Sequence, residues 1–427
     1  MNEPKLTVSI DSRYDVRVEE VRYYPDVFDF LLCRFPHTMS LKLSSNLPQH
    51  LQDAIYDKIG AWIEFTGPDS EGTIRMAPYR DQDDYLLEGT FCPPQPGNYQ
   101  FRIILVIENE QYVVAEGERE IIAPRAQERW THGPIAIEIE EGLFLGNAAA
   151  GADPLFLEER VRGKDLRPAI AIVNAAGERQ TRSALLSANT PGKTRFVYRQ
   201  FPFTDFSDNP LDKAELWNAV KWMQEQIGRG PVLVHCHAGI GRAGSLVVAY
   251  LRLFRHPEKT FDQIVETVKE VVKKEGHHIF PHVGLPESLK DFQEDEQCRK
   301  VLANLLGKES YECAAEPAGE VRSIAFANGY EIGQTRTLLR GEEIVVQATV
   351  AYEGAEPRGV FAHTNLSEDN QEIPMGRVGE DLYQTRVRAT RVGEKFWLTA
   401  SATTRQFDHP VKRRWIGGDT YFNVNSE

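Results

Sequence analysis

The sequence predicts an α/β domain between two all-β sandwich domains. Short strand-like stretches of alternating hydrophobicity fill residues 5–122, strand-like and helical patterns alternate over 135–300, and the strand-like pattern returns after 320. Hydrophobic residues make up 41% of the 427 residues, which is enough apolar side chain for several cores. We therefore expect three domains, with boundaries at 1–125, 131–306 and 318–427.

The first domain is predicted from strands separated by turn-forming clusters. The strand-like stretches are WIEF (62–65), YQFRIILVI (99–107) and YVVA (112–115), and the turns between them are rich in glycine and proline. This spacing favours an immunoglobulin-like β-sandwich. Residues 123–134 lose the alternation and contain two prolines, so we interpret them as a linker.

The middle domain alternates strands and helices. Strands are expected at 169–176, 196–203 and 231–236, and residues 211–227 place apolar side chains on one helical face at a spacing of about 3.6 residues. Further helices are predicted at 243–255, 258–274 and 284–306.

The third domain repeats the pattern of the first. After a second linker at 307–320, strands are predicted at 342–352, 359–364, 381–390 and 395–404. Residues 74–103 also run parallel to residues 373–399, which pairs Met76 with Met375, Tyr85 with Tyr383 and Gly97 with Gly393. We interpret the two sandwiches as related copies; the alternative is that antiparallel sandwiches in general share this pattern.

Charge and composition exclude several classes of partner. The chain has 49 basic and 63 acidic residues, a net charge of −14, which repels nucleic acid and anionic lipid. No apolar run approaches the roughly 18 residues of a membrane span, and the first residues do not have the pattern of a signal peptide. Five widely spaced cysteines without a CxxC pair argue against disulfides and zinc. We expect a cytoplasmic protein without a metal or cofactor.

The segment VLVHCHAGIGRAGSLVVAYL (232–251) carries the chemistry. An aliphatic strand leads to Cys236, a short loop follows, and an apolar helix begins at Arg242. Such a loop turns its backbone N–H groups inward at a helix N-terminus and forms an anion site of the size of a phosphate dianion. Gly239 and Gly241 are expected to supply the backbone freedom that the loop needs. The predicted phosphate-binding residues are His237, Ala238, Gly239, Ile240 and Gly241.

Cys236 and Arg242 have distinct expected roles. Inward N–H dipoles, the helix N-terminus and the Arg242 charge favour the thiolate of Cys236, which is a nucleophile toward bound phosphate. The planar guanidinium of Arg242 can hold two phosphoryl oxygens. His235 is expected to brace the loop through backbone hydrogen bonds. The alternative for Cys236 alone is a small apolar side chain buried at the end of a strand.

These residues resemble the cysteine-based phosphatases, whose signature is HCxxGxxR followed by Ser or Thr. The surrounding motifs resemble the dual-specificity branch, over about residues 135–300: EEGLFLGNAAAG (140–151), IAIVNAA (170–176), FPFTDF (201–206) and IFPHVGLPESLKDF (279–292). The resemblance implies a phosphatase core with a mixed central sheet and helices on both faces.

A general acid must also protonate the leaving oxygen. Asp205 and Asp208 both qualify, and the resemblance places the acid on Asp205; Asp208 is the rival and can equally cap the helix at 211. The implied mechanism has Cys236 form a thiophosphoryl enzyme while Asp205 protonates the leaving group, after which Asp205 activates water. No metal is required.

The chain departs from the family directly after Arg242. Ala243 occupies the position where the family has a Ser or Thr that stabilises the departing thiolate. Ser245 matches a second hydroxyl position and is predicted to support the site. We expect this departure to affect the rate of turnover more than the type of reaction.

The substrate is left open by the sequence. His237 and Ile240 replace the lysines typical of related phosphoinositide phosphatases, which disfavours an inositol phosphate. The string CHAGIGR fits glucan phosphatases and also tyrosine phosphatases, and the sandwiches resemble modules of α-glucan-acting enzymes. Phosphorylated protein, phosphorylated glucan and a non-catalytic phosphate-binding scaffold remain as alternatives. The aromatic residues that either stack on sugars or lie in cores are Trp62, Trp397, Trp415 and Tyr421.

Overall fold

The computed structural model describes two compact units. Its described residues are 6–426 except 12–13, 25–30, 47–51, 53–55, 57, 82–83, 125, 127, 163–168, 190–193, 206–210, 283–284, 315–318, 328, 330–333, 355–356, 358, 367–370, 404–413 and 416–419. The first unit contains the N-terminal sandwich and the central sheet (1–205, 211–255 and 265–281); the second contains 206–210, 256–264 and 282–427. The predicted division into three domains therefore stays a prediction.

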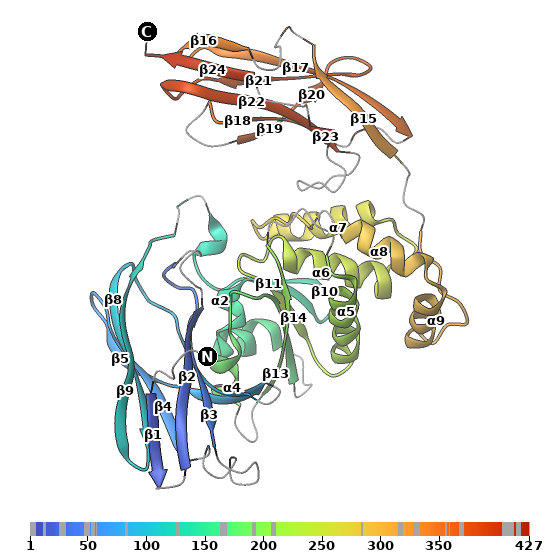
Figure 1. Cartoon of the computed structure of the whole chain (residues 1–427). Coiled ribbons are helices and arrows are strands. Elements are labelled where there is room, and N and C mark those ends of the chain that lie inside the picture. Colours follow the sequence, from blue (N-terminus) through green and yellow to red (C-terminus); the bar gives the residue numbers. More distant parts are fainter. Residues whose placement is uncertain are drawn as a thin grey trace. The chain divides into compact units, whose positions relative to one another are not determined.

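The N-terminal sandwich consists of two antiparallel sheets (blue to cyan in Figure 1). The alternating burial along its strands explains why the sequence signals them, since successive side chains point to opposite faces. One sheet has the order β1 (Leu6–Asp11), β2 (Tyr14–Tyr24), β3 (His37–Ser45), β7 (Asp84–Phe91) and β6 (Ala77–Asp81). The other has the order β5 (Glu71–Arg75), β4 (Ile59–Thr66), β8 (Gly97–Ile107) and β9 (Glu110–Ile121).

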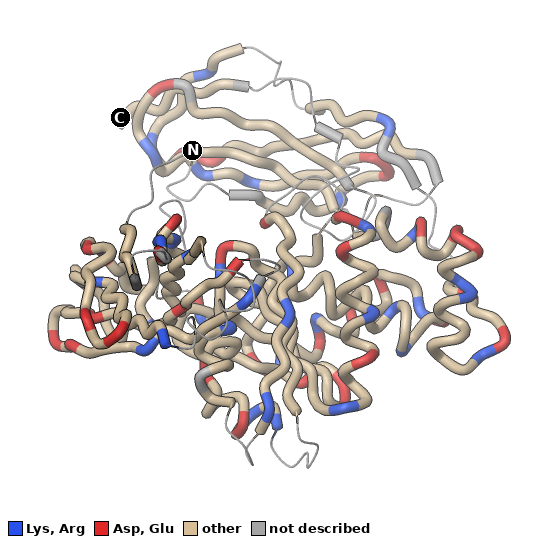
Figure 2. The backbone as a smooth tube through the Cα atoms, turned by 60° about the horizontal axis from the view of Figure 1, so that its bottom comes forward, with Lys and Arg blue, Asp and Glu red and all other residues tan. Residues whose placement is uncertain are grey.

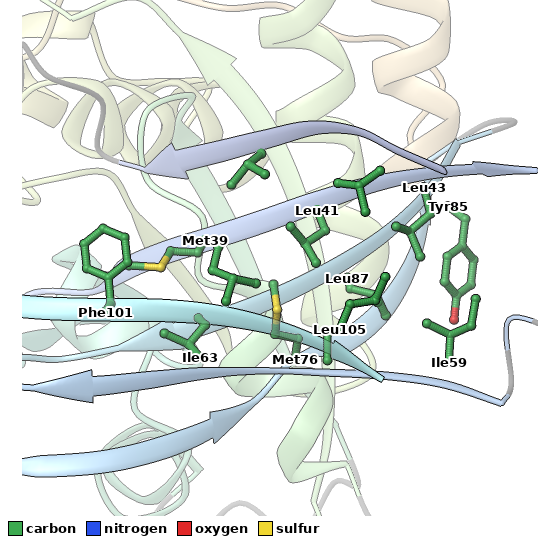
Figure 3. Close-up of a cluster of buried hydrophobic side chains, with 14 of the residues drawn as sticks. Met39, Leu41, Leu43, Ile59, Ile63, Met76, Tyr85, Leu87, Phe101 and Leu105 are labelled. Carbon is green, nitrogen blue, oxygen red and sulfur yellow. The ribbon is translucent and has the colours of Figure 1, made fainter. Parts of the chain in front are cut away.

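The core of this sandwich lies between its two sheets. Leu41 and Leu87 come from one sheet, Ile63 and Leu105 come from the other, and all four side chains are buried together (Figure 3). Burial of an aliphatic side chain of this size contributes about 1.5–3 kcal/mol. The sandwich therefore has a hydrophobic core of its own.

The central sheet is mixed, as the sequence predicts. Its order is β10 (Ala136–Glu140), β11 (Leu143–Gly146), β14 (Val232–His235), β12 (Ala169–Ala176) and β13 (Arg195–Phe203). β10 and β11 pair antiparallel, whereas β11, β14, β12 and β13 pair parallel. β14, which leads to Cys236, thus lies in the middle of the sheet.

Helices cover both faces of this sheet (Figure 1). Ile170 and Ile172 pack with Leu157 and Leu185 on one face, while α5 and α6 contact β12 and β14, whose alternate side chains point the other way. The first set comprises α2 (Ala148–Gly151), α3 (Pro154–Phe156), the π-helix η2 (Leu157–Arg162) and α4 (Arg182–Ala188). The other helices are α5 (Lys213–Ile227), α6 (Arg242–Tyr250), the π-helix η3 (Leu251–Arg255) and α7 (Phe261–Lys274).

Two expectations about helix ends are wrong. The helix predicted at 284–306 is two helices, α8 (Leu285–Glu294) and α9 (Glu296–Leu305), because the Asp295 carboxylate accepts a hydrogen bond from the Cys298 N–H and starts a new helix. The N-cap of α5 is Asp212, whose carboxylate accepts from the Glu215 N–H, so Asp208 does not cap it. Asp208 itself lies outside the described residues.

The second unit contains a sandwich built from two further sheets. One has the order β15 (Gly319–Phe326), β17 (Glu343–Gly354), β21 (Leu382–Arg388) and β20 (Gly376–Arg377). The other has the order β16 (Thr335–Leu339), β24 (Thr420–Asn425), β22 (Gly393–Thr403), β18 (Gly359–Thr364) and β19 (Gln371–Pro374), with β23 (Arg414–Trp415) paired to β22. The strands predicted from the sequence in this region are confirmed.

The two sandwiches share one strand order. The sequence β2-β3-β7-β6 corresponds to β15-β17-β21-β20, and β5-β4-β8-β9 corresponds to β19-β18-β22-β24. Tyr85 pairs with Leu43, and Tyr383 pairs with Ala348 at the equivalent place. Gly97 and Gly393 both begin a strand at positive φ, 136° and 150°. The predicted relationship between the two sandwiches is therefore repeated in their topology.

Charges are spread over both units. Figure 2 shows acidic and basic residues interspersed along the helices and strands. Within the described part of the chain, no helix combines the length and the apolar character needed to cross a bilayer.

Candidate active site

Three neighbouring parallel strands bring the site together. The carboxyl ends of β14, β12 and β13 lie at the same edge of the sheet, where ligands bind in open α/β sheets. Cys236 follows β14 and Asp205 follows β13, as the sequence indicates. Glu178, which the sequence analysis did not single out, follows β12. Its position after the NAA motif, at the end of a buried strand, was the available signal.

The segment 236–241, which we call the Cys236 loop, connects β14 to α6. Gly239 has a φ of 78°, and a Cβ atom there would lie 2.6 Å from the carbonyl oxygen of Gly146. Only glycine fits this position. Gly241 has a φ of −84° and room for a Cβ atom, so conformational freedom explains Gly239 but not Gly241.

Carbonyl groups of the Cys236 loop accept hydrogen bonds from residues outside the loop. The carbonyl oxygen of His237 accepts from the Ala148 N–H at 3.0 Å, and that of Ile240 accepts from the Phe280 N–H at 3.3 Å. The ring of His277 donates to the Gly239 carbonyl oxygen at 3.2 Å. When the carbonyls of a curled loop point outward, its N–H groups point inward and form an anion site. His277 was missed because it lies 38 residues after Gly239 in the sequence and reaches the loop only through the fold.

Arg242 is the best-connected side chain at the site. It is 1% exposed, and its guanidinium donates to both oxygens of Glu178 at 2.6 and 2.7 Å and to Asp205 at 2.8 Å. Burial by itself lowers the pKa of Arg242, but the hydrogen bonds to Glu178 and the charges of Cys236 and Asp205 raise it above its ordinary value. The arginine is permanently charged here.

The Nε atom of this guanidinium can donate a hydrogen bond to a ligand. The Nε atom of Arg242 is buried and has no hydrogen-bond partner among the described residues. A buried donor without a partner is costly, and a phosphoryl oxygen would satisfy it. Glu178 therefore holds the guanidinium by its other two nitrogens and fixes its orientation.

Cys236 and Asp205 both precede Arg242 in the chain, and the fold brings both charges close to its guanidinium. Cys236 is 3% exposed and is the first residue of the loop that ends at the N-terminus of α6, where the helix dipole favours negative charge. The Asp205 side chain is 37% exposed and hydrogen-bonds to Arg242. The nucleophile, the arginine and the acid predicted from the sequence are thus brought to one site.

His235 is buried beneath the loop. Its Nδ1 donates to the carbonyl oxygen of Cys236 at 3.1 Å, and its Nε2 lies 3.3 Å from the Thr181 hydroxyl, which can donate to it. Burial lowers the pKa of His235 to about 4, so the ring is neutral. Ser245, the other supporting residue, donates to the carbonyl oxygen of Gly241 at 3.0 Å and is held within α6.

The remaining candidates lie apart from the site or outside the described residues. Trp62, Trp397 and Tyr421 are half-buried in the two sandwiches, and the Trp415 side chain is not among the described ones. Over the described ranges, no group of three or more His, Cys, Asp or Glu side chains is arranged to hold a metal ion.

Comparisons with known proteins match parts of the chain. A family model described as protein-tyrosine phosphatase matches residues 169–279. Receptor-type tyrosine-protein phosphatase V of Rattus norvegicus is 42% identical over 80 residues, which are 17% of this chain but only 5% of the relative. Dual specificity protein phosphatase 1B of Arabidopsis thaliana is 26% identical over 161 residues (38% of this chain and 83% of the relative).

Two further proteins match part of the chain. Dual specificity protein phosphatase 14 of Homo sapiens is 27% identical over 206 residues, which are 48% of this chain and 88% of that protein. The crystal structure of DUSP15 aligns with 40% of this chain and 94% of its own, at 19% identity and a TM-score of 0.29.

Proposed function

We propose that this protein hydrolyses phosphate monoesters through a phosphocysteine intermediate on Cys236, since residues 169–279 match a protein-tyrosine phosphatase family model and its relatives include dual-specificity protein phosphatases. The observation that carries the proposal is the convergence of Cys236, Arg242 and Asp205 at the carboxyl ends of the parallel strands of the central sheet, with the Nε of Arg242 without a partner among the described residues.

In the first step the substrate phosphate occupies the Cys236 loop. The N–H groups of residues 237–241 and the Nε of Arg242 donate to its oxygens, and the Cys236 thiolate attacks phosphorus. The S–P bond forms while the bond to the leaving oxygen breaks, and Asp205 gives its proton to that oxygen. Loop amides and guanidinium together stabilise the charge that develops on the phosphoryl oxygens.

In the second step Asp205 acts as a base. It takes a proton from water, the water oxygen attacks phosphorus, and the S–P bond breaks to return the Cys236 thiolate and inorganic phosphate. Ala243 offers no hydroxyl to the departing thiolate, and the Ser245 hydroxyl is bonded within α6. We therefore expect the second step to limit the rate.

Asp205 must exchange its partner during this cycle. It bonds to Arg242 as a carboxylate, and the same guanidinium also binds Glu178. When a phosphate dianion binds Arg242, it competes with the Asp205 side chain for this guanidinium, and Asp205 can turn to the leaving-group oxygen instead. Glu178 stays in place and keeps the guanidinium oriented.

We propose that the substrate is a phosphorylated protein, with phosphotyrosine and also phosphoserine or phosphothreonine as targets. Two relatives named above are dual-specificity protein phosphatases, which supports this choice. The Phe280 side chain, 42% exposed beside the Cys236 loop, offers an apolar surface to an aromatic leaving group. The phosphoglucan and scaffold alternatives have no support among the relatives named above.

The rest of the chain enters the proposal in two ways. In the lettering of the immunoglobulin fold, β2-β3-β7-β6 is the sheet A-B-E-D and β5-β4-β8-β9 is the sheet C′-C-F-G, and the second sandwich has the same two orders. This supports an immunoglobulin-like assignment of the predicted flanking domains. The free cysteines support the predicted location in the cytoplasm.

The test compares wild type with Cys236→Ser on p-nitrophenyl phosphate, a phosphotyrosine peptide, a phosphothreonine peptide and phosphorylated amylopectin. We expect wild type to hydrolyse the first three, and the variant to lose at least about 10³-fold in kcat/KM on each. The matched control is Cys298→Ser in α9, which should retain wild-type rates. Turnover by Cys236→Ser, or hydrolysis of amylopectin alone, would contradict the proposal.

A further inference from the structure

The N-terminal sandwich is joined to the central sheet by a buried ion pair. Glu88 on β7 accepts two hydrogen bonds from Arg182 on α4, at 2.5 and 2.6 Å, and both side chains are almost fully buried. Burial lowers the pKa of Arg182, but the paired Glu88 raises it above the ordinary value. A bidentate pair of this kind fixes both position and orientation of the two elements.

A chain of hydroxyl groups extends this junction toward the site. Thr90 lies 2.6 Å from Ser183 and 2.6 Å from Thr38, and the Thr38 hydroxyl donates to the carbonyl oxygen of Gln180 at 2.5 Å. Ser183 and Gln180 belong to the segment that follows β12. The same segment supplies Glu178, which orients Arg242. The sandwich is therefore bonded to the peptide that presents Glu178.

A third contact reaches the Cys236 loop itself. Phe35, which precedes β3, is fully buried, and its ring centre lies 5.3 Å from that of His237 and 5.9 Å from that of Trp130. The rings of Trp130 and His237 are 5.4 Å apart in an edge-on arrangement. Phe35 clusters with Ala148 and Ala149 rather than with the core of its own sandwich.

Arg179 completes this contact. It is fully buried, donates to the carbonyl oxygen of Pro36 at 3.2 Å, and directs its Nε to the Nδ1 of His237 at 3.3 Å. Since arginine only donates, the His237 ring nitrogen that bonds to it must accept. One guanidinium thus connects the backbone of the sandwich with the first residue after Cys236.

From these contacts we infer that the N-terminal sandwich is a working part of the phosphate site, in which Phe35 and Arg179 are positioning residues for the Cys236 loop. They fix the His237 ring, and through it the peptide that follows the nucleophile. The N–H groups of this loop bind phosphate only when they converge, so a loop released at its His237 end binds the dianion less well. The inference rests on the proposed function only in taking the Cys236 loop as the phosphate site; neither phosphate binding nor alkylation of Cys236 requires turnover.

The test uses the full chain with Phe35→Ala. Binding of inorganic phosphate is measured by calorimetry, alkylation of Cys236 by iodoacetate is followed at pH 7, and stability is recorded as the urea midpoint. We expect phosphate to bind about 10-fold more weakly and alkylation to slow several-fold. Phe35→Leu, which keeps much of the apolar contact, should recover part of both losses.

The matched control is Leu105→Ala, a truncation in the core of the same sandwich away from the loop. It should lower the urea midpoint and leave phosphate affinity within about twofold of wild type. Arg179→Lys is the second variant, because lysine keeps the charge but lacks the planar guanidinium that reaches both Pro36 and His237; we expect phosphate to bind about threefold to 10-fold more weakly.

Two results would overturn the inference: unchanged phosphate affinity in both Phe35→Ala and Arg179→Lys, or an equal loss in Leu105→Ala. Failure of the proposed function has a different signature. Wild type would then bind phosphate but hydrolyse no ester, and the binding comparison between the variants would still decide the role of the sandwich.

Discussion

The two sandwiches have the same strand order, but one equivalent face is buried in the first sandwich and exposed in the second. Counting from Tyr85 and Tyr383, Glu88 on β7 corresponds to Arg386 on β21. Glu88 is buried against Arg182, whereas Arg386 is 71% exposed and lies 3.7 Å from Glu343, which is 47% exposed. A shared scaffold therefore does not set the role of a module; the side chains on one face do.

The largest expected difference between the sandwiches concerns their ion pairs. Glu88→Ala leaves the Arg182 charge buried without its partner and should destabilise the first unit by about 3–5 kcal/mol. Arg386→Ala removes an exposed pair and should change stability by less than about 1 kcal/mol. Urea denaturation of both variants measures the contrast, and equal losses would show that the buried junction has no special weight.

Acidification should weaken the first unit selectively. The pKa of His235 is about 4 in the folded state and about 6.5 when unfolded, so between these values the unfolded chain binds more protons. The contribution of neutral His235 to the free energy of unfolding is fully present above pH 6.5. It is lost as the pH falls toward 4, by on the order of 3 kcal/mol. Urea midpoints at pH 7.5 and 5 check this, with His235→Asn expected to reduce the pH dependence. A midpoint that rises on acidification would refute it.

Neutralising one carboxylate in each unit should have a smaller effect, and only in the first unit should it lower the rate of catalysis. Glu178→Gln removes the charge that orients Arg242, and we expect kcat/KM for p-nitrophenyl phosphate to fall about 10-fold to 100-fold, or about 1.4–2.7 kcal/mol. Glu343→Gln, in the exposed pair of the second unit, should leave the rate unchanged. Steady-state kinetics on both variants provides the measurement, and a similar rate loss in the two would argue against a specific role for Glu178.

The smallest expected effect concerns the hydroxyl chain. Thr90→Val interrupts the hydrogen bonds between Thr38 and Ser183 and should cost about 1 kcal/mol. Counting from Tyr85 and Tyr383, Thr90 corresponds to Arg388, which is exposed. Arg388→Val should therefore leave stability nearly unchanged. Thermal denaturation resolves a difference of this size. A destabilising Arg388→Val would mean that the second sandwich also uses this face.

Local patterns were sufficient for the strands and for much of the site. The alternation along β8 and β12 and the contiguous string from Cys236 to Arg242 are visible because the residues that act together are close in sequence. Glu178 was missed because it reaches Arg242 only through the order of β12 and β14 in the sheet. The break at Asp295 was missed because residues 293–297 contain neither glycine nor proline, the usual signals of a helix end.

The connection between the N-terminal sandwich and the central sheet looked like a linker, yet it contributes Trp130. The Asn147 side chain donates to the carbonyl oxygens of Trp130 and Gly133, both at 2.9 Å, and the Trp130 ring faces His237. Residues inserted into this connection would therefore displace Trp130 from His237, the residue that follows Cys236. Recombination that exchanged the sandwich for another module would have to replace this tryptophan's neighbours as well, so the two parts are expected to be inherited together.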